Sequence, residues 1–186
     1  MKWEVISSEY IYKHSPYVQL RKDVCRQPNG KIIPAYYVAE LPLSVIIFPI
    51  VDNKVMMIQQ YRHPVEDVLW EFPGGFTEIN EDPEAAALRE LEEETGYQFT
   101  SVTSLGKVAA NPGILNNYTH IFIADGGYEK TKQQQDENED ILVKFFSFDE
   151  LNEMIKQNGI LQSMHLNACF LSLIHLGKLK FSQPFI

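Results

Sequence analysis

The chain has 186 residues, of which 45% are hydrophobic, and a formal net charge of −9. This length favours one domain with at most a small appendage, and the apolar share is enough for a sizeable core. The negative charge argues against general nucleic-acid binding, which needs basic patches, and no apolar run is long enough to cross a bilayer. Cys25 and Cys169 stand in unrelated contexts, which disfavours a disulfide framework or a zinc site and fits a reducing cytoplasm.

The first forty residues are predicted to form strands. Residues 10–12 and 17–20 are short, partly alternating segments, Pro28-Asn29-Gly30 is a hairpin-turn signal, and residues 32–39 form the returning strand. We therefore expect a small antiparallel sheet. Its edges need cover, which either its own core or a second subunit can supply.

Two apolar runs, residues 43–51 and 55–60, predict a central hairpin joined by Asp52-Asn53-Lys54. Arg62 follows at the end of the second strand. An arginine there either lies on the surface or, beside a phosphate site, binds a substrate phosphate. The residues alone leave both interpretations open.

A glycine turn and one acidic helix make up residues 71–97. A strand over residues 68–72 leads into Gly74-Gly75, where the backbone can turn tightly and approach a ligand closely. Asp82 is a natural N-cap, Pro83 suits the first helical position, and Gly96 is a C-terminal stop. The spacing predicts a helix that begins at Pro83.

Three glutamates share one face of that helix, because Glu90, Glu93 and Glu94 fall at i, i+3 and i+4. Like charges placed so close repel one another, and a run of glutamates is ordinarily a solvated face. This face follows directly on Gly74-Gly75, however, and beside exposed backbone oxygens the carboxylates form a hard-oxygen site suited to Mg²⁺ or Mn²⁺. Arg89 is then available to pair with a carboxylate and fix its orientation.

The rest of the chain is expected to alternate strands, turns and two helices. Strands are predicted over residues 99–109, 118–124 and 141–148, with a turn at residues 111–113 and helices over residues 148–157 and 163–176. Asp149 is the expected cap of the first of these helices. Residues 126–140 are polar, and residues 130–135 (KTKQQQ) are predicted to be a flexible surface loop.

The stretch around the glutamates resembles a Nudix box, whose pattern is G-x5-E-x7-R-E-U-x-E-E-x-G-U with U a bulky apolar residue. All nine specified positions are filled, by Gly75, Glu81, Arg89, Glu90, Leu91, Glu93, Glu94, Gly96 and, loosely, Tyr97. Nine positions at the correct spacing make this signal far more specific than a lone glycine motif. The resemblance implies a hydrolase of nucleoside diphosphates linked to another moiety, dependent on a divalent metal.

Three further segments resemble the ADP-ribose pyrophosphatase branch of that family. They are QQYRHP, which contains Arg62, a proline sixteen residues after Gly96, namely Pro112, and the DENED sequence of residues 136–140. The substrate implied is ADP-ribose or another ADP-sugar, with AMP and ribose 5-phosphate as products from ADP-ribose. The FPGG sequence departs from the usual branch form, which has Ala in the third place.

The resemblance also implies roles for individual residues. Glu137 would be the catalytic base and Glu139 a metal ligand, although these two could be exchanged. The remaining roles it implies are catalysis by Glu93 and Arg89, substrate binding by Arg62, Gly75 and Pro112, and metal binding by Gly74, Glu90, Glu93 and Glu94.

The fold implied is α/β, a Nudix α/β/α sandwich with a mixed sheet. Residues 1–42 would form the N-terminal antiparallel sheet and residues 43–186 the hydrolase domain. In the family such a sheet often forms a dimer contact, so we expect a homodimer. Nucleic acid and membrane partners are not expected.

Two alternatives remain open at this stage. GDP-mannose or another nucleotide sugar suits the same loop pattern, and a non-catalytic sensor could bind ADP-ribose without hydrolysing it. All acids of the box are present, which favours an enzyme. Cleansing of oxidised nucleoside triphosphates would leave QYR, Pro112 and DENED unexplained.

Overall fold

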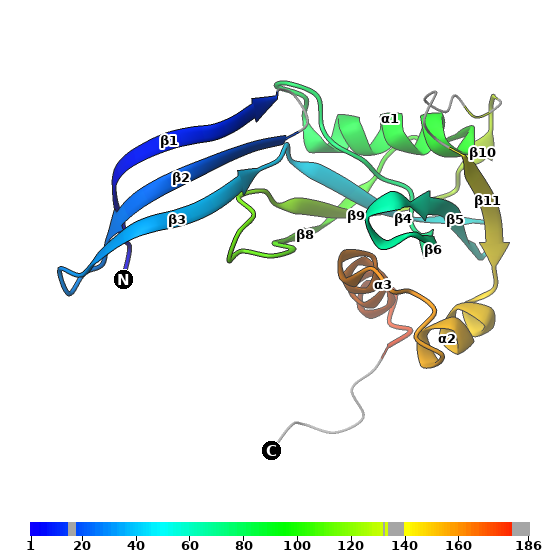
Figure 1. Ribbon diagram of the computed structural model, residues 1–186. Helices are drawn as coiled ribbons and strands as arrows, with labels where there is room; N and C mark the ends of the chain where they lie inside the picture. The colour runs from blue at the N-terminus through cyan, green and yellow to red at the C-terminus, as the bar shows by residue number, and fades with distance from the viewer. Residues whose placement is uncertain (15–17, 132, 134–139, 180–186) are drawn as a thin grey trace, which may run out of the picture. The chain divides into compact units, whose positions relative to one another are not determined.

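The computed structural model describes residues 1–14, 18–131, 133 and 140–179. The chain divides into two compact units, each with its own sheet (Figure 1). The smaller unit comprises Met1–Leu43 and Ala109–Tyr118, and the larger comprises Ser44–Val108 and Thr119–Ile186.

The smaller unit is an antiparallel sheet of three strands in the order β1-β2-β3, namely Glu4–His14, Val18–Arg26 and Ile32–Glu40. The predicted turn at Pro28-Asn29-Gly30 joins β2 to β3, and Gly30 has a φ of 85°, which favours glycine. The segment Ala109–Tyr118 joins this unit through an isolated parallel β-bridge between Ala39 and Leu115. The predicted N-terminal sheet is confirmed.

The larger unit is built on a mixed sheet in the order β11-β5-β4-β9-β8, with β6 also paired to β5. Strands β4 and β9 run parallel, and the other pairs are antiparallel. The bounds are β4 Ser44–Val51, β5 Lys54–Arg62, β6 Asp67–Glu71, β8 Thr103–Val108, β9 Thr119–Asp125 and β11 Ile141–Phe146. The predicted hairpin is present, and Asp52 and Asn53 at its turn both have positive φ values.

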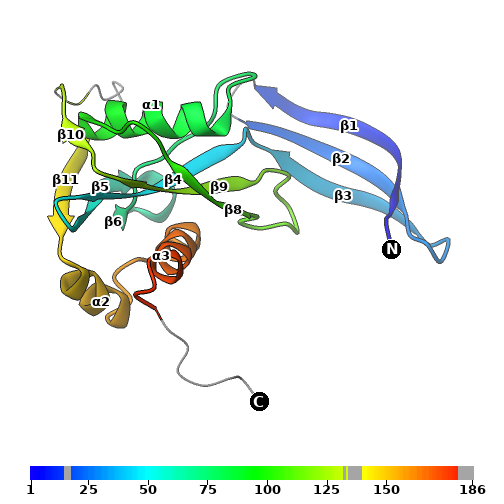
Figure 2. The ribbon, with the colours of Figure 1, turned by 180° about the vertical axis from the view of Figure 1, so that it is seen from behind.

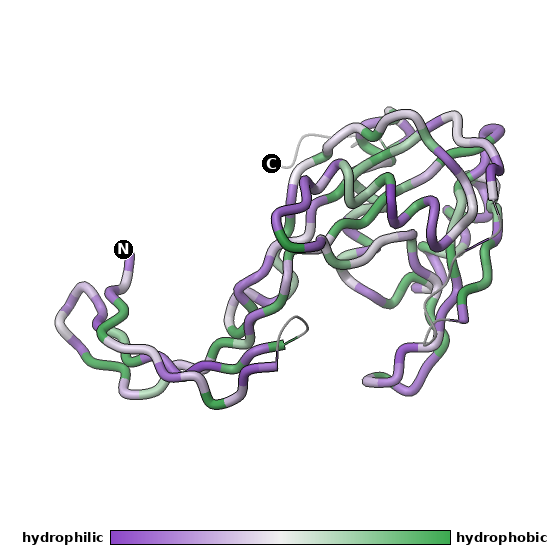
Figure 3. The backbone as a smooth tube through the Cα atoms, turned by 90° about the horizontal axis from the view of Figure 1, so that it is seen from above, coloured by the Kyte–Doolittle hydropathy of each residue, from purple (hydrophilic) through white to green (hydrophobic). Residues whose placement is uncertain are grey.

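Helices cover both faces of this sheet, so the predicted α/β/α sandwich is confirmed. Helix α1, Pro83–Thr95, lies on one face and helix α3, Ser163–His175, on the other, with α2, Phe148–Lys156, beyond the end of β11 (Figures 1 and 2). In the larger unit, hydrophobic and hydrophilic residues alternate along α1, as expected of a helix with one buried face (Figure 3).

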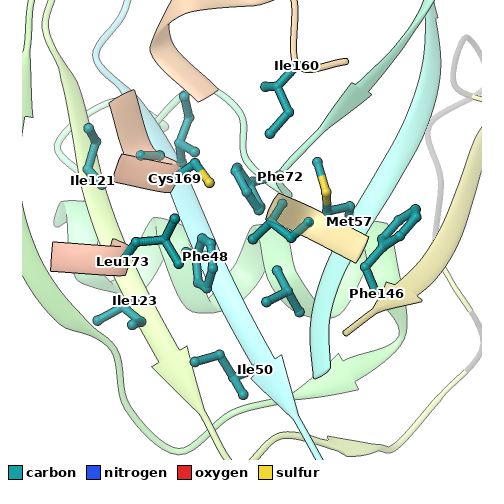
Figure 4. Close-up of a cluster of buried hydrophobic side chains, with 14 residues drawn as sticks. Phe48, Ile50, Met57, Phe72, Ile121, Ile123, Phe146, Ile160, Cys169 and Leu173 are labelled. Atoms are coloured by element: carbon teal, nitrogen blue, oxygen red, sulfur yellow. The ribbon is translucent and has the colours of Figure 1, made fainter. Parts of the chain in front are cut away.

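Each face of the sheet has its own hydrophobic core. On the α3 side, Phe48 and Phe72 pack with ring centroids 4.9 Å apart, beside the buried thiol of Cys169 (Figure 4). On the α1 side, Ala86, Ala87 and Leu91 pack against the strands. Because alternate residues of a strand point to opposite faces, the apolar run of β4 contributes to both cores.

The ends of helix α1 agree with the sequence. The Asp82 side chain accepts a hydrogen bond from the Glu84 N–H, Pro83 is the first helical residue, and Gly96 is left-handed at φ 76°. Helix α2 differs, because its cap is Ser147 and not Asp149. The Ser147 side chain accepts from the Glu150 N–H while the Glu150 carboxylate accepts from the Ser147 N–H.

Two short strands were not predicted. Strands β7, Tyr97–Gln98, and β10, Tyr128–Glu129, pair antiparallel with each other outside the main sheet. A two-residue strand has too few positions for an alternating pattern. Among the described residues, no helix is both long and apolar enough to cross a membrane.

Candidate functional site

The glycine turn is held along the edge of strand β4. The Val45 N–H donates to the Gly75 carbonyl and the Ile47 N–H to the Pro73 carbonyl, both at 2.9 Å. A side chain at Gly74 would collide with the Val45 carbonyl oxygen, and Gly74 has a φ of 157°. The close contact between turn and strand therefore requires glycine.

Two carboxylates of helix α1 lie directly against the glycine pair. The Gly74 N–H donates to Glu94 Oε2 at 2.8 Å, and Glu94 is only 4% exposed. A Cβ atom at Gly75 would lie 2.6 Å from Glu90 Oε1. The two glycines thus bring the backbone of the turn and the carboxylates of the helix into contact.

Arg89 orients three carboxylates at once. Its Nε and Nη2 donate to the two oxygens of Glu81 at 2.9 Å each, and its Nη1 donates to Glu90 at 2.8 Å and to Glu93 at 2.9 Å. The hydrogen bond from Arg89 lowers the pKa of Glu81, and the same bond raises the pKa of Arg89. Arg89 therefore offsets the repulsion among these acids.

The donor atoms at this place fit a hard divalent cation in their chemistry. Carboxylate oxygens of Glu90 and Glu94 lie beside the peptide groups of a glycine turn, and a side chain on Gly75 would fill the space next to Glu90. Within the described ranges, no group of three or more His, Cys, Asp or Glu side chains is arranged to hold a metal ion. The contacts seen for Glu90 and Glu93 are to the Arg89 guanidinium.

Arg62 is paired with a fully buried acid. Its Nη2 lies 2.5 Å from Glu71 Oε2, its Nε lies 3.1 Å from Glu71 Oε1, and 38% of its side chain is exposed. Glu71 is the last residue of β6 and Arg62 the last of β5, and the two strands are paired. Arg62 is thus a fixed guanidinium close to the glycine turn in sequence and partly open to solvent.

The C-terminal end of α1 is bonded to the segment that leads toward residue 137. The Gly96 carbonyl accepts from the Lys130 N–H at 3.0 Å and from the Thr131 N–H at 3.1 Å. Gln133 Nε2 donates to the carbonyl of Glu94 at 2.6 Å and to that of Ile141 at 3.3 Å. Of the segment predicted to be a flexible surface loop, Lys130, Thr131 and Gln133 are described; they lie outside helices and strands and bond to the end of α1, and the other residues lie outside the described ranges.

Not every predicted site residue can be placed. The structure brings together Gly74, Gly75, Arg89, Glu90, Glu93 and Glu94, where the glycine turn meets the C-terminal half of helix α1. Glu137 and Glu139 lie outside the described residues. Pro112 belongs to the smaller unit, in a turn where the Ile114 N–H donates to the Asn111 carbonyl at 3.1 Å.

Sequence reasoning gave no role to two buried polar residues next to the turn. Glu71 holds Arg62, and His165 of α3 accepts the Phe72 N–H on Nδ1 at 2.9 Å. An acid within the apolar segment VLWEF was a usable signal for Glu71. A single histidine in an amphipathic helix carries no such signal.

Comparison with known proteins identifies two regions. The NUDIX domain matches residues 40–164, and the nucleoside diphosphate sugar hydrolase N-terminal domain matches residues 3–39. A crystal structure of an ADP compounds hydrolase superposes with a TM-score of 0.82 at 22% identity, covering 96% of this chain and 98% of that one. At that identity the match shows the fold alone.

Two curated relatives match most of the chain. A methanol dehydrogenase activator of Bacillus methanolicus is 34% identical over 86% of each protein. An ADP-ribose pyrophosphatase of Bacillus subtilis (strain 168) is 30% identical over 84% of this chain and 85% of its own length. The resemblance seen in the sequence is confirmed, and the chain belongs to the Nudix family.

Proposed function

We propose that this chain hydrolyses the pyrophosphate bond of ADP-ribose to give AMP and ribose 5-phosphate, with a divalent cation. The observation that carries the proposal is the glycine turn packed against Glu90 and Glu94 on a helix whose acids are oriented by Arg89. The Bacillus subtilis relative named for this activity supports the choice of substrate.

The reaction is attack by water on one phosphorus, with the bridging oxygen leaving on the other phosphate. Both phosphates are anionic, so repulsion opposes the approach of any nucleophile that carries negative charge. The proposed ligands of the cation, Mg²⁺ with Mn²⁺ as the alternative, are the Gly74 carbonyl and the carboxylates of Glu90, Glu93, Glu94 and Glu139. A divalent cation supplies charge neutralisation and a more acidic water when it is bound.

The remaining roles fall to side chains of the chain itself. Glu137 takes the proton of the attacking water. Arg89 keeps Glu90 and Glu93 in fixed orientations through the Nη1 bonds. Arg62, held by Glu71, contacts a phosphate through the exposed part of its guanidinium. Gly75 and Pro112 are proposed to contact the substrate, and Glu93 to act in catalysis as well as in metal binding.

The test is hydrolysis of ADP-ribose and of GDP-mannose with Mg²⁺, with products separated by chromatography. We expect AMP and ribose 5-phosphate from the wild-type chain. Glu94→Gln should lower the rate by roughly two orders of magnitude, because it replaces a carboxylate that holds both cation and turn. Glu92→Gln, which alters a glutamate paired with Lys130, is the matched control and should retain activity.

Each other result points to a different function. Turnover of GDP-mannose alone would keep the mechanism and replace the substrate. Binding of ADP-ribose without any turnover would favour the sensor. Full activity of Glu94→Gln would contradict the assignment of the metal-binding helix.

We further propose that the chain forms a homodimer through residues 1–42 and acts in the cytoplasm. Every residue of β1 is exposed, and β1 is an edge strand of its sheet. Its exposed apolar side chains include Val5, Ile6, Ile11 and Tyr12. An apolar edge strand of this kind is suited to pairing with a second copy. Cys25 and Cys169 are buried free thiols, which fits a reducing compartment.

A further inference from the structure

A chain of three side chains runs from helix α3 to the end of strand β5. His165 of α3 is 4% exposed, and its Nε2 lies 3.8 Å from Oε2 of Glu71. Glu71 has no exposed surface, and Arg62 Nη2 lies 2.5 Å from the same Oε2 atom. The last member, Arg62, is the proposed phosphate ligand.

The hydrogen bonds determine the tautomer of His165. Its Nδ1 accepts the Phe72 N–H at 2.9 Å, so that nitrogen carries no proton. Burial, with a smaller contribution from the Arg62 charge, lowers the pKa of His165 to about 3, and the ring is neutral near pH 7. The proton is therefore on Nε2, which faces the Glu71 carboxylate at a distance longer than a hydrogen bond.

The other arm of His165 reaches the glycine turn. Phe72 is two residues before Gly74. The turn that follows Phe72 is fixed in two ways: the Pro73 and Gly75 carbonyls accept hydrogen bonds from N–H groups of β4, and the Gly74 N–H donates to Glu94. The bond from the Phe72 N–H to His165 fixes the start of the same turn from the α3 side of the sheet.

We propose that His165 is a positioning residue that holds the glycine turn through the Phe72 N–H and orients Glu71, the partner of the phosphate-binding Arg62, through the dipole of its Nε2–H bond. This inference rests on the proposed function, because it takes Gly74 and Arg62 as ligands of cation and substrate. His165 lies one residue past the span matched by the NUDIX domain. The ordinary role of a buried histidine is to satisfy one backbone N–H, and such a role would affect stability alone.

Two substitutions test the Phe72 contact and the Glu71 contact of His165 separately, because a side-chain amide can replace either ring nitrogen. In His165→Asn the side-chain oxygen can take the place of Nδ1 and keep the Phe72 bond, while nothing faces Glu71. In His165→Gln the amide nitrogen can take the place of Nε2, while the acceptor for Phe72 is lost. His175→Gln, on the exposed end of the same helix, is the matched control.

The readouts are equilibrium measurements made on the full chain. Binding of Mn²⁺ alone is followed by the electron paramagnetic resonance signal of the free ion, and binding of α,β-methylene ADP-ribose by calorimetry. Thermal unfolding without metal gives the stability of each variant. Glu71→Gln, which removes the charge that holds Arg62, is a second route to the substrate arm if His165→Asn does not fold.

The two variants should lose different affinities. His165→Gln should weaken Mn²⁺ binding about tenfold. His165→Asn and Glu71→Gln should each weaken binding of the analogue about tenfold, the size of effect found for residues that orient a ligand-binding group without touching the ligand. Equal losses of stability in both His165 variants, with both affinities within about twofold of wild type, would overturn the proposal. A wild type that binds the analogue but does not hydrolyse ADP-ribose would refute the proposed function while the affinities still decide the role of His165.

Discussion

The guanidinium of Arg89 fixes the orientation of three acids, one just before helix α1 and two on it. Arg89 supplies two parallel hydrogen bonds to Glu81 and one nitrogen to both Glu90 and Glu93. A lysine could not reproduce this fork. The local chemistry explains why an arginine stands beside a glutamate in the middle of the motif.

The pairing of Glu81 with Arg89 predicts a pH dependence of stability. The pKa of Glu81 is lowered from 4.5 in the folded chain by the Arg89 hydrogen bond, so the unfolded chain binds the proton more tightly. The pair stabilises the fold above the unfolded pKa, and that stabilisation is lost as the pH falls through the folded pKa. Glu81→Gln should lower the unfolding temperature at about pH 6, and this deficit should shrink at a pH well below 4.5.

The control for this experiment is Glu84→Gln, an exposed residue in the first turn of the same helix. It should leave the unfolding temperature near that of wild type at both pH values. A Glu81→Gln deficit that is the same at low and neutral pH would contradict the explanation through the pKa of Glu81.

At the scale of elements, the end of helix α1 requires glycine at position 96 for two reasons. Its φ of 76° favours glycine, and a Cβ atom there would collide with the Thr131 carbonyl oxygen. Gly126 has a similar φ of 79°, but a Cβ atom there would meet nothing within 4 Å. The two glycines therefore separate the cost of the backbone conformation from that of the contact.

Gly126→Ala should lower the free energy of unfolding by about 1 kcal/mol, the cost of a left-handed backbone. Gly96→Ala should cost about 1 kcal/mol more, because the Thr131 carbonyl must move away. Denaturant titration measures both values. Equal losses in the two variants would mean that the contact between the helix end and Thr131 contributes little.

Local signals predicted most of the elements, and their failures have local causes. Asp82, Pro83 and Gly96 define α1 because each satisfies or omits a backbone group at a helix end. For α2 the sequence indicated Asp149 as the cap, whereas the reciprocal bonds with Glu150 make Ser147 the cap in the structure.

The same reasoning separates the parts of the site that could be predicted. The spacing of Glu90, Glu93 and Glu94 determines their common face, because a helix repeats regularly. The contacts of Glu71 and His165 join residues 94 positions apart, and no local pattern carries that information. Gln133 lies outside helices and strands, as its polar neighbours predicted, but no local pattern indicates that its amide bonds to a helix end.

At the scale of the whole molecule, the order of the strands is the part of the fold that local sequence patterns do not predict. The parallel pairing of β4 with β9 joins segments separated by more than sixty residues, and Ala109–Tyr118 belongs with the N-terminal strands. The alternating and apolar runs predicted both strands, but their pairing depends on which surfaces pack best.

The proposed dimer predicts a concentration-dependent mass. Light scattering of the wild-type chain at micromolar concentration should give twice the monomer mass of 21.4 kDa. Ile11→Glu, on the exposed edge strand, should shift the mass toward the monomer because it places a charge in an apolar contact. Ile79→Glu, at an exposed position in the larger unit, is the control and should remain dimeric. A wild-type monomer would contradict the proposal.

The two thiols should report the opening of the two units separately. Cys169 has no exposed surface and burial raises its pKa to about 12, while Cys25 of the smaller unit is 6% exposed. In Cys25→Ser, the thiol that remains should not react with a disulfide reagent in the native state and should react fully in denaturant. Rapid labelling of native Cys25→Ser would show that the core on the α3 side opens readily.

The amide of Gln133 has a consequence for how this enzyme type can diversify. Because one side chain bonds to the carbonyls of both Glu94 and Ile141, it fixes where the chain leaves helix α1 and where it enters strand β11. This tie depends on one amide side chain that lies outside the glutamate motif of residues 75–97. Substitution at position 133 can therefore change how the helix end and the strand are held together, without any change to the helix that carries the acids.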